Sequence, residues 1–68
     1  MFNKMTLTKD GKVYRLTQIG LEFYIEDEDT RKCVDSRCCM DGWTYAGRAA
    51  LRQWVESLGY TVTRMKAI

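Results

Sequence analysis

One stretch, Thr44 to Gly59 (TYAGRAALRQWVESLG), has the periodicity of an amphipathic helix, and it limits what the rest of the chain can form. Around Leu51, small and apolar residues gather on one side of a helical wheel: Gly47, Ala50, Trp54, Val55 and Leu58. The other side is polar: Arg48, Arg52, Gln53 and Glu56. Asp41 or Thr44 is the expected N-cap residue. Gly59 is placed to end the helix in a left-handed conformation, with Tyr60 packing over that end.

The residues before this helix read as antiparallel strands. Asp10-Gly11 lies between two apolar segments and is a strong signal for a two-residue hairpin loop. Such a loop pairs Leu7 with Tyr14 and Met5 with Leu16, so the large apolar side chains share one face. A second turn at Ile19-Gly20 sets Leu16 opposite Phe23 and Tyr14 opposite Ile25. Both turns predict the same inner face.

The later strands are less sharply marked. The acidic run from Glu26 to Asp29 predicts a turn, and a fourth strand from Arg31 to Asp35 follows it. This register places Val34 near Phe23 and Arg31 near Glu26. Ser36 to Trp43 is expected to be an irregular connection. Tyr60 to Met65 is rich in β-branched and aromatic residues and predicts a last strand. Its inward face is left open, because Val62 and Met65 do not share a parity.

These elements predict a single α+β domain over residues 1–68. It is an antiparallel β-meander of three to four strands, with one amphipathic helix packed on one face and a C-terminal strand. The expected core residues are Met5, Leu7, Tyr14, Leu16, Phe23, Ile25, Val34, Leu51, Trp54, Val55, Leu58 and Val62. The second sheet face, facing solvent or a partner, carries Thr6, Thr8, Val13, Arg15, Thr17, Glu22, Tyr24, Glu26 and Cys33.

Composition narrows the function classes. Sixty-eight residues suffice for one core, and the net charge of +2 is below that of a dedicated nucleic-acid binder. There is no apolar stretch of about 18 residues, so no membrane partner is expected. Without a secretion signal, and with an odd number of cysteines, we expect a cytoplasmic protein with reduced thiols.

No catalytic or cofactor motif stands out. The chain has no His, no phosphate-binding loop, no nucleophile elbow and no dinucleotide fingerprint, so we expect a protein that is not an enzyme. The three cysteines, Cys33, Cys38 and Cys39, lie close together in the sequence and are the candidate metal ligands. Their Cys-x4-Cys-Cys spacing does not fit a zinc site, and a fourth ligand would have to be Asp35 or Asp41. We therefore expect free thiols and neither a metal nor a cofactor.

Charge along the chain is segregated. Residues 1–20 carry a net +3, residues 21–30 carry −5, and residues 31–68 carry +4. The acidic run is a solvated hairpin tip, a tip that docks on a basic surface, or a mimic of phosphate charge. An acidic corner between basic ends can orient a partner electrostatically.

Two surfaces are candidates for binding. The first is the uncovered sheet face, centred on the predicted cross-strand neighbours Arg15 and Tyr24, because Tyr and Arg are frequent at the energetic centres of interfaces. Its predicted members are Arg15, Tyr24 and Glu26 at the centre, with Asp27 and Glu28 at the rim. The competing surface is the polar side of the helix, with Arg48, Arg52 and Glu56. Arg15 and Tyr24 could also hold a nucleotide, but Glu22 and Glu26 on the same face repel a phosphate backbone.

The last 20 residues, AALRQWVESLGYTVTRMKAI, resemble the end of a small bacteriophage protein that inhibits the host RNA polymerase. The residues that carry the resemblance are Ala50, Trp54, Gly59, Tyr60, Val62, Thr63 and Arg64. The compact sheet-plus-helix build is also similar to that of some phage anti-CRISPR proteins. The resemblance implies an inhibitor encoded by a phage or mobile element, which binds a larger protein or ribonucleoprotein complex of the host. It transfers no binding residue and no oligomeric state. The alternative function is a small nucleic-acid-binding regulator.

Overall fold

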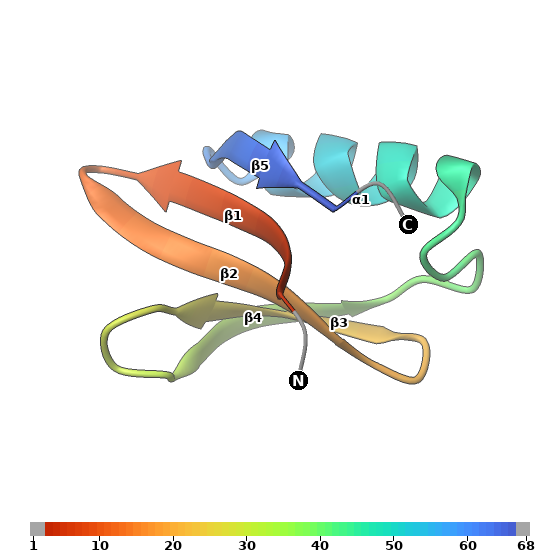
Figure 1. The fold of residues 1–68 in the computed structure, drawn as a ribbon, viewed down its shortest axis with the longest axis horizontal. Coiled ribbons are helices and arrows are strands. Elements are labelled where there is room, and N and C mark those ends of the chain that lie inside the picture. The colour runs from red at the N-terminus through yellow and green to blue at the C-terminus, as the bar shows by residue number, and fades with distance from the viewer. Residues whose placement is uncertain (1–2, 67–68) are drawn as a thin grey trace.

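The structure, a computed structural model, describes residues 3–66. Its elements are β1 (Asn3–Lys9), β2 (Lys12–Ile19), β3 (Glu22–Asp27), β4 (Cys33–Cys38), α1 (Tyr45–Ser57) and β5 (Thr61–Met65). The strands form one antiparallel five-stranded sheet in the order β4-β3-β2-β1-β5. Figure 1 shows a strongly twisted sheet with α1 along one side, beside β5. The predicted α+β fold, a meander with one helix and a C-terminal strand, is therefore confirmed.

The β1–β2 hairpin forms as the sequence predicts. Asp10 and Gly11 have φ of 52° and 78°, the positive values that a two-residue hairpin loop needs. Leu7 lies opposite Tyr14, and Met5 lies opposite Leu16. Met5, Leu7 and Leu16 are buried, so this register places the apolar side chains in the core.

The predicted register between β2 and β3 is wrong by two residues. Ile19 pairs with Glu22, so the turn is Gly20-Leu21, and Leu16 lies opposite Ile25. A turn at Ile19-Gly20 would put a β-branched residue at the first central position, which requires a positive φ. Gly20 adopts that conformation instead, with φ of 60°. Because the shift is even, the predicted inner face is kept.

β4 also begins later than predicted, at Cys33. Arg31 has a positive φ of 62° and belongs to the turn after β3. In the observed register Phe23 lies opposite Arg37, Ile25 lies opposite Asp35 and Glu26 lies opposite Cys33. Val34 is the extra residue of a β-bulge and is 51% exposed. The predicted register, with Val34 near Phe23 and Arg31 near Glu26, is therefore wrong by three residues at Phe23, and an odd shift exchanges the two faces. The assignment of Val34 to the core is wrong for this reason, and because every residue of β4 is exposed.

A β-bulge also explains the parity of β5. Val62 lies opposite Leu7 and Met65 lies opposite Met5, with the register shifting between these pairs. Thr63 is the extra residue, and its hydroxyl donates to the carbonyl oxygen of Thr6 at 3.2 Å. Both Val62 and Met65 can therefore contact the core from one strand, although their numbers differ in parity.

Both ends of α1 form as predicted. The Thr44 hydroxyl accepts a hydrogen bond from the Gly47 N–H at 3.2 Å, so Thr44 is the N-cap residue. Gly59 has φ of 94°, and the N–H of Tyr60 donates to the carbonyl oxygen of Val55 at 3.1 Å. The buried core consists of Met5, Leu7, Leu16, Phe23, Ile25, Cys39, Leu51, Val55 and Tyr60. Tyr14, Trp43, Trp54, Leu58, Val62 and Met65 pack around it, partly buried. The sequence analysis did not place Cys39 or Tyr60 in the core.

Candidate protein-binding surface

The sheet face opposite α1 is called the outer face. By strand alternation and pairing, it carries Thr6, Thr8, Val13, Arg15, Thr17, Ile19, Glu22, Tyr24, Glu26, Cys33, Ser36, Cys38 and Arg64. Among residues 3–66, α1 is the only helix, and it packs on the inner face. Five hydrogen-bonded strands therefore form a rigid surface over which no other described helix or strand packs, although Thr17 within it is only 4% exposed.

Arg15 lies near the centre of the outer face and is held by acidic neighbours. It is opposite Glu26 on β3, and its Nε lies 3.5 Å from Oε2 of Glu28. Both partners of this ion pair are more than a third exposed, so the pair stabilises the fold little. Its main effect is to orient the guanidinium along the surface. Arg15, Glu26 and Glu28 are thus brought together as predicted.

Tyr24 lies diagonally from Arg15. The predicted direct pairing of the two is wrong, because Tyr24 is opposite Thr17 in the observed register. Its hydroxyl donates to Oε2 of Glu22 at 3.3 Å. Burial, followed by the Glu22 carboxylate, raises the pKa of Tyr24, so the phenol remains a donor at neutral pH. The half-buried ring offers an anchor of limited mobility.

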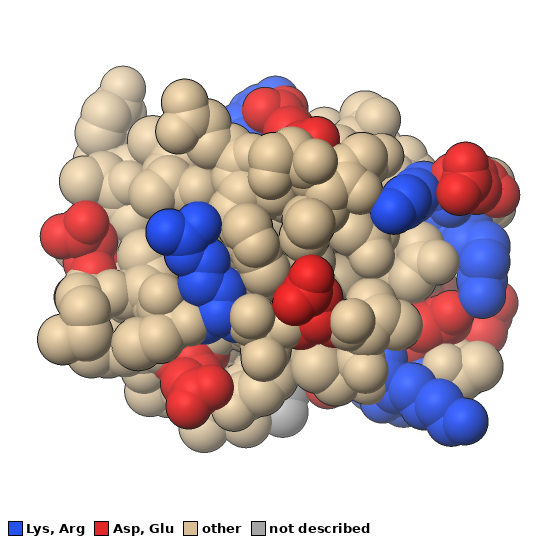
Figure 2. Space-filling view, turned by 180° about the vertical axis from the view of Figure 1, so that it is seen from behind, with Lys and Arg blue, Asp and Glu red and all other residues tan. Residues whose placement is uncertain are grey.

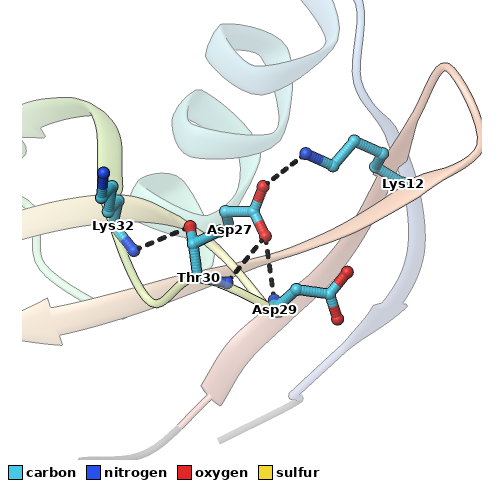
Figure 3. A network of polar contacts seen from close by, with 5 residues as sticks. All are labelled: Lys12, Asp27, Asp29, Thr30 and Lys32. Atoms are coloured by element: carbon cyan, nitrogen blue, oxygen red, sulfur yellow. Dashed lines mark hydrogen bonds and ion pairs between the residues drawn. The ribbon is translucent and has the colours of Figure 1, made fainter.

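Asp27, predicted at the rim of this surface, lies on the inner side of the sheet and is only 5% exposed. Figure 3 shows its carboxylate between Lys12 and the turn that follows β3. It lies 2.8 Å from the Lys12 Nζ and accepts hydrogen bonds from the N–H groups of Asp29 and Thr30 at 2.9 and 3.2 Å. Lys12, and then Thr30, lower the pKa of Asp27, so it stays ionised. Its role is structural, and it is left out of the candidate surface.

The outer face changes sign from one side to the other. Glu22 and Glu26 lie on β3, with Glu28 just beyond it. Arg64 lies on β5, opposite Thr6, and lines a groove of about 340 Å³ at the ends of β1 and β5. That groove is lined by Lys4, Met5, Thr6, Arg64, Met65 and Lys66 and contains no acidic side chain. Arg64 escaped the sequence analysis because the bulge at Thr63 reverses the alternation of β5.

Charges also gather at one end of the molecule. Seen from behind the view of Figure 1, acidic and basic side chains cluster over the end that carries the β1–β2 and β3–β4 turns (Figure 2). Elsewhere on that side, only scattered charges interrupt an uncharged surface. Acidic and basic segments that are separate along the sequence therefore lie side by side at the turns. On the outer face, the acidic side chains of Glu22, Glu26 and Glu28 are confined to β3 and the residue just after it.

The helix side is the competing surface, and its polar residues are largely engaged. Arg48 donates from Nη1 to the carbonyl oxygen of Trp43 at 3.0 Å, and so fixes the loop before α1. Arg52 and Glu56 form an ion pair at 3.3 Å within one helical turn. Beside them, Tyr45 is 83% exposed and lines a groove of about 320 Å³ between α1 and β5. Sequence reasoning missed Tyr45, although its position on the polar side of the helical wheel is a usable signal.

The cysteines do not form a metal centre in the part of the chain that the structure describes. Cys33 and Cys38 are exposed, Cys39 is buried, and all three are free thiols. Within residues 3–66, no three His, Cys, Asp or Glu side chains are grouped so that they could hold a metal ion. In the same residues, no helix has the length and apolar character needed to cross a membrane.

Comparisons with known proteins add no family to this description. The chain matches no protein-family model, and no curated protein or solved structure is significantly similar to it.

Proposed function

We propose that this protein is a small non-enzymatic binding protein, which occupies a surface of a larger protein or ribonucleoprotein complex and thereby inhibits or modulates it. The observation that carries the proposal is the outer face, on which Arg15, Tyr24 and Glu26 lie together on two adjacent strands, with Glu28 just after β3. Hydrogen-bonded strands hold the backbone beneath these side chains in place, so little backbone freedom is lost on binding.

The side chains on this face suit a charged protein surface. Tyr24 supplies a large, half-buried ring with a hydroxyl donor, and Arg15 supplies a planar cation already oriented by Glu28. Glu22 and Glu26, together with Glu28, form an acidic stripe that attracts a basic patch. The complementary partner surface has a pocket that accepts the ring of Tyr24 and basic side chains around that pocket.

The kind of target and the setting are part of the same proposal. The resemblance of the last 20 residues to a phage inhibitor of host RNA polymerase supports an inhibitor encoded by a phage or mobile element, polymerase-inhibitor-like or anti-CRISPR-like. A complex in the cytoplasm of the host is the target that this reading implies.

Affinity capture from a lysate of the source cell, followed by mass spectrometry, identifies the partner. With the purified partner, we expect Tyr24→Ala to weaken binding about 30-fold, as the loss of an interface anchor does. The melting temperature of the free protein should be nearly unchanged, because the ring contributes no contact to the core cluster. Calorimetric titration measures the first quantity, and thermal denaturation measures the second.

Tyr45→Ala is the matched control, since it makes the same truncation on an exposed tyrosine of the competing helix side. We expect it to leave the affinity unchanged. If Tyr45→Ala or the charge reversal of Arg52 abolishes binding while Tyr24→Ala does not, the helix side is the binding surface and the proposal is wrong.

A second candidate function, a nucleic-acid-binding regulator, is favoured by one observation. The groove between β1 and β5 is lined by Lys4, Arg64 and Lys66 without an acidic residue. Phosphate contacts make affinity fall steeply with salt, because condensed counterions are released. A steep loss of binding to a single- or double-stranded oligonucleotide with added salt, reduced by Arg64→Ala, would support this function over the first.

A further inference from the structure

β4 forms one open edge of the sheet. It is hydrogen-bonded to β3 on one side, and no other described strand pairs with its second side. All six residues of β4 are exposed, and the strand contains neither Pro nor Lys, the residues that commonly discourage pairing at an edge. β4 has its own bulge at Val34, so its regular part runs from residue 35 to residue 38, whereas β5 at the opposite edge is interrupted by the bulge at Thr63.

The backbone of β4 directs the Ser36 amide toward this open edge. Just after β4, the N–H of Cys39 donates to the carbonyl oxygen of Leu21, on the β3 side, at 2.8 Å. Backbone groups alternate in direction along an antiparallel strand, so those of Ser36 point away from β3. In agreement, the Ser36 N–H is bonded at 2.8 Å to Oδ1 of the adjacent Asp35 and not to a strand. The side chain of Asp35 covers a donor that a neighbouring strand could use.

Ser36 is flanked by residues of opposite charge. Asp35 lies opposite Ile25, and Arg37 lies opposite Phe23, so both project to the side of the sheet that carries the core. Neither side chain forms an ion pair within the described part of the chain. Arg37 lines a groove of about 410 Å³ beside the half-buried ring of Trp54. The edge therefore carries an acid and a base without charged partners, two residues apart.

We propose that β4 pairs with β4 of a second copy of this chain, antiparallel and about a two-fold axis at Ser36. In this register Asp35 of each copy lies opposite Arg37 of the other. The sequence around Ser36 is self-complementary in charge, which a two-fold interface requires, since each copy offers the same surface. The pairing joins the two sheets into one, independently of the outer face and of the proposed function.

The geometry of antiparallel pairing fits these residues. The two Ser36 residues form a hydrogen-bonded pair, in which each N–H gives up Oδ1 of Asp35 for the carbonyl oxygen of the other copy. That exchange releases the Asp35 carboxylate for Arg37 of the other copy. Asp35 and Arg37 then occupy a non-hydrogen-bonded pair, whose Cα atoms are only about 4.5 Å apart, so the side chains meet. Opposite charges at such positions stabilise strand pairing, and like charges destabilise it.

The test is the mass in solution of variants that reverse one charge, measured by sedimentation equilibrium. We expect the parent protein to have twice the mass of one chain. With Asp35→Arg, an arginine at position 35 of each copy lies opposite Arg37 of the other, and with Arg37→Asp, an aspartate at position 37 lies opposite Asp35, so each variant alone should be a monomer. An equimolar mixture of the two should regain the double mass, because each strand then faces the opposite charge. The double variant carrying both changes should also be a dimer.

Two controls separate pairing from loss of fold. Lys32→Glu makes a charge reversal just outside β4 and should leave the dimer intact. Ser36→Pro removes the N–H at the open edge and should give a monomer with an unchanged far-ultraviolet circular dichroism spectrum. A parent protein that is monomeric throughout the micromolar range overturns the proposal, even if β4 then binds an extended peptide of another protein. So does a dimer that both single reversals leave intact. Binding through Tyr24 is measured in a separate experiment, by titration with the purified partner, so the failure of either proposal can be distinguished from the failure of the other.

Discussion

The carboxylate of Asp27 holds together the turn between β3 and β4. It bonds to the Lys12 ammonium on β2 and to two N–H groups of the turn, while the backbone of the same residue bonds to Arg31 and Lys32. The acidic run of residues 26–29 has the composition of a solvated turn, but Asp27 within it is buried and stabilises the structure. The signal was present in the sequence, because Asp27 continues the inward alternation of Phe23 and Ile25.

The stability of the protein should therefore depend on the ionisation of Asp27. Its folded pKa is lowered, so its contribution is present above the unfolded pKa of about 4 and is lost as the pH falls through the folded pKa. We expect Asp27→Asn to lower the free energy of unfolding at pH 7 and to flatten its decline below about pH 5. Urea denaturation at a series of pH values measures both effects.

Asp29→Asn is the control for this experiment, because Asp29 contributes its backbone N–H, and not its carboxylate, to the hydrogen bond with Asp27. It should retain the acid-dependent loss of stability of the parent. If Asp27→Asn and the parent lose stability in parallel on acidification, another carboxylate is responsible for the fall in the free energy of unfolding at low pH.

At the scale of elements, local signals predicted the helix and the first hairpin. The wheel around Leu51 and the Asp10-Gly11 turn were sufficient, because each element specifies itself within a few residues. The register of β3 failed by two residues, since hydrophobic alternation cannot distinguish even shifts. The bulges at Val34 and Thr63 were invisible to a period-two pattern. Consequently the outer face was largely predicted, while Arg64 and the open edge of β4 were not.

Within α1, burial decides which side chain contributes most to stability. Leu51 is 1% exposed, whereas Trp54 is half-buried beside a surface groove. We expect Leu51→Ala to lower the free energy of unfolding by about 2–5 kcal/mol and Trp54→Ala by less, because part of the indole already contacts water. Urea denaturation of both variants at one pH gives the order. A larger loss for Trp54→Ala would show that α1 is rotated about its axis relative to this structure.

At the scale of the whole molecule, the sheet carries more exposed surface than one helix can cover. α1 covers the inner side and leaves two surfaces open, the outer face with Arg15 and Tyr24 and the edge formed by β4. Arg15 and Tyr24 lie on β2 and β3, whereas the edge pairing uses Asp35, Arg37 and the backbone of Ser36 on β4, so one protein can present both surfaces at once. A two-fold pair through β4 would carry two outer faces on one continuous sheet.

Pairing of this kind makes the apparent stability depend on protein concentration. Because association stabilises only the folded state, we expect the melting temperature of the parent protein to rise as its concentration is increased. Asp35→Arg should melt at a temperature independent of concentration. Thermal denaturation followed by circular dichroism over a wide range of concentrations makes the comparison, and a parent melting temperature that stays constant contradicts it.

The bulge at Thr63 determines how far such an assembly can grow. A sheet with two regular edges could add copies at both ends and polymerise into a fibre. Here Thr63 interrupts the regular spacing of backbone groups along β5, and the cations Arg64 and Lys66 lie at the end of that strand. Addition at β5 is therefore hindered, and once two β4 edges have met, β5 with its bulge is the edge left at each end of the joined sheet. The extra residue at Thr63 thus limits such an assembly to two copies and works against the growth of a fibre.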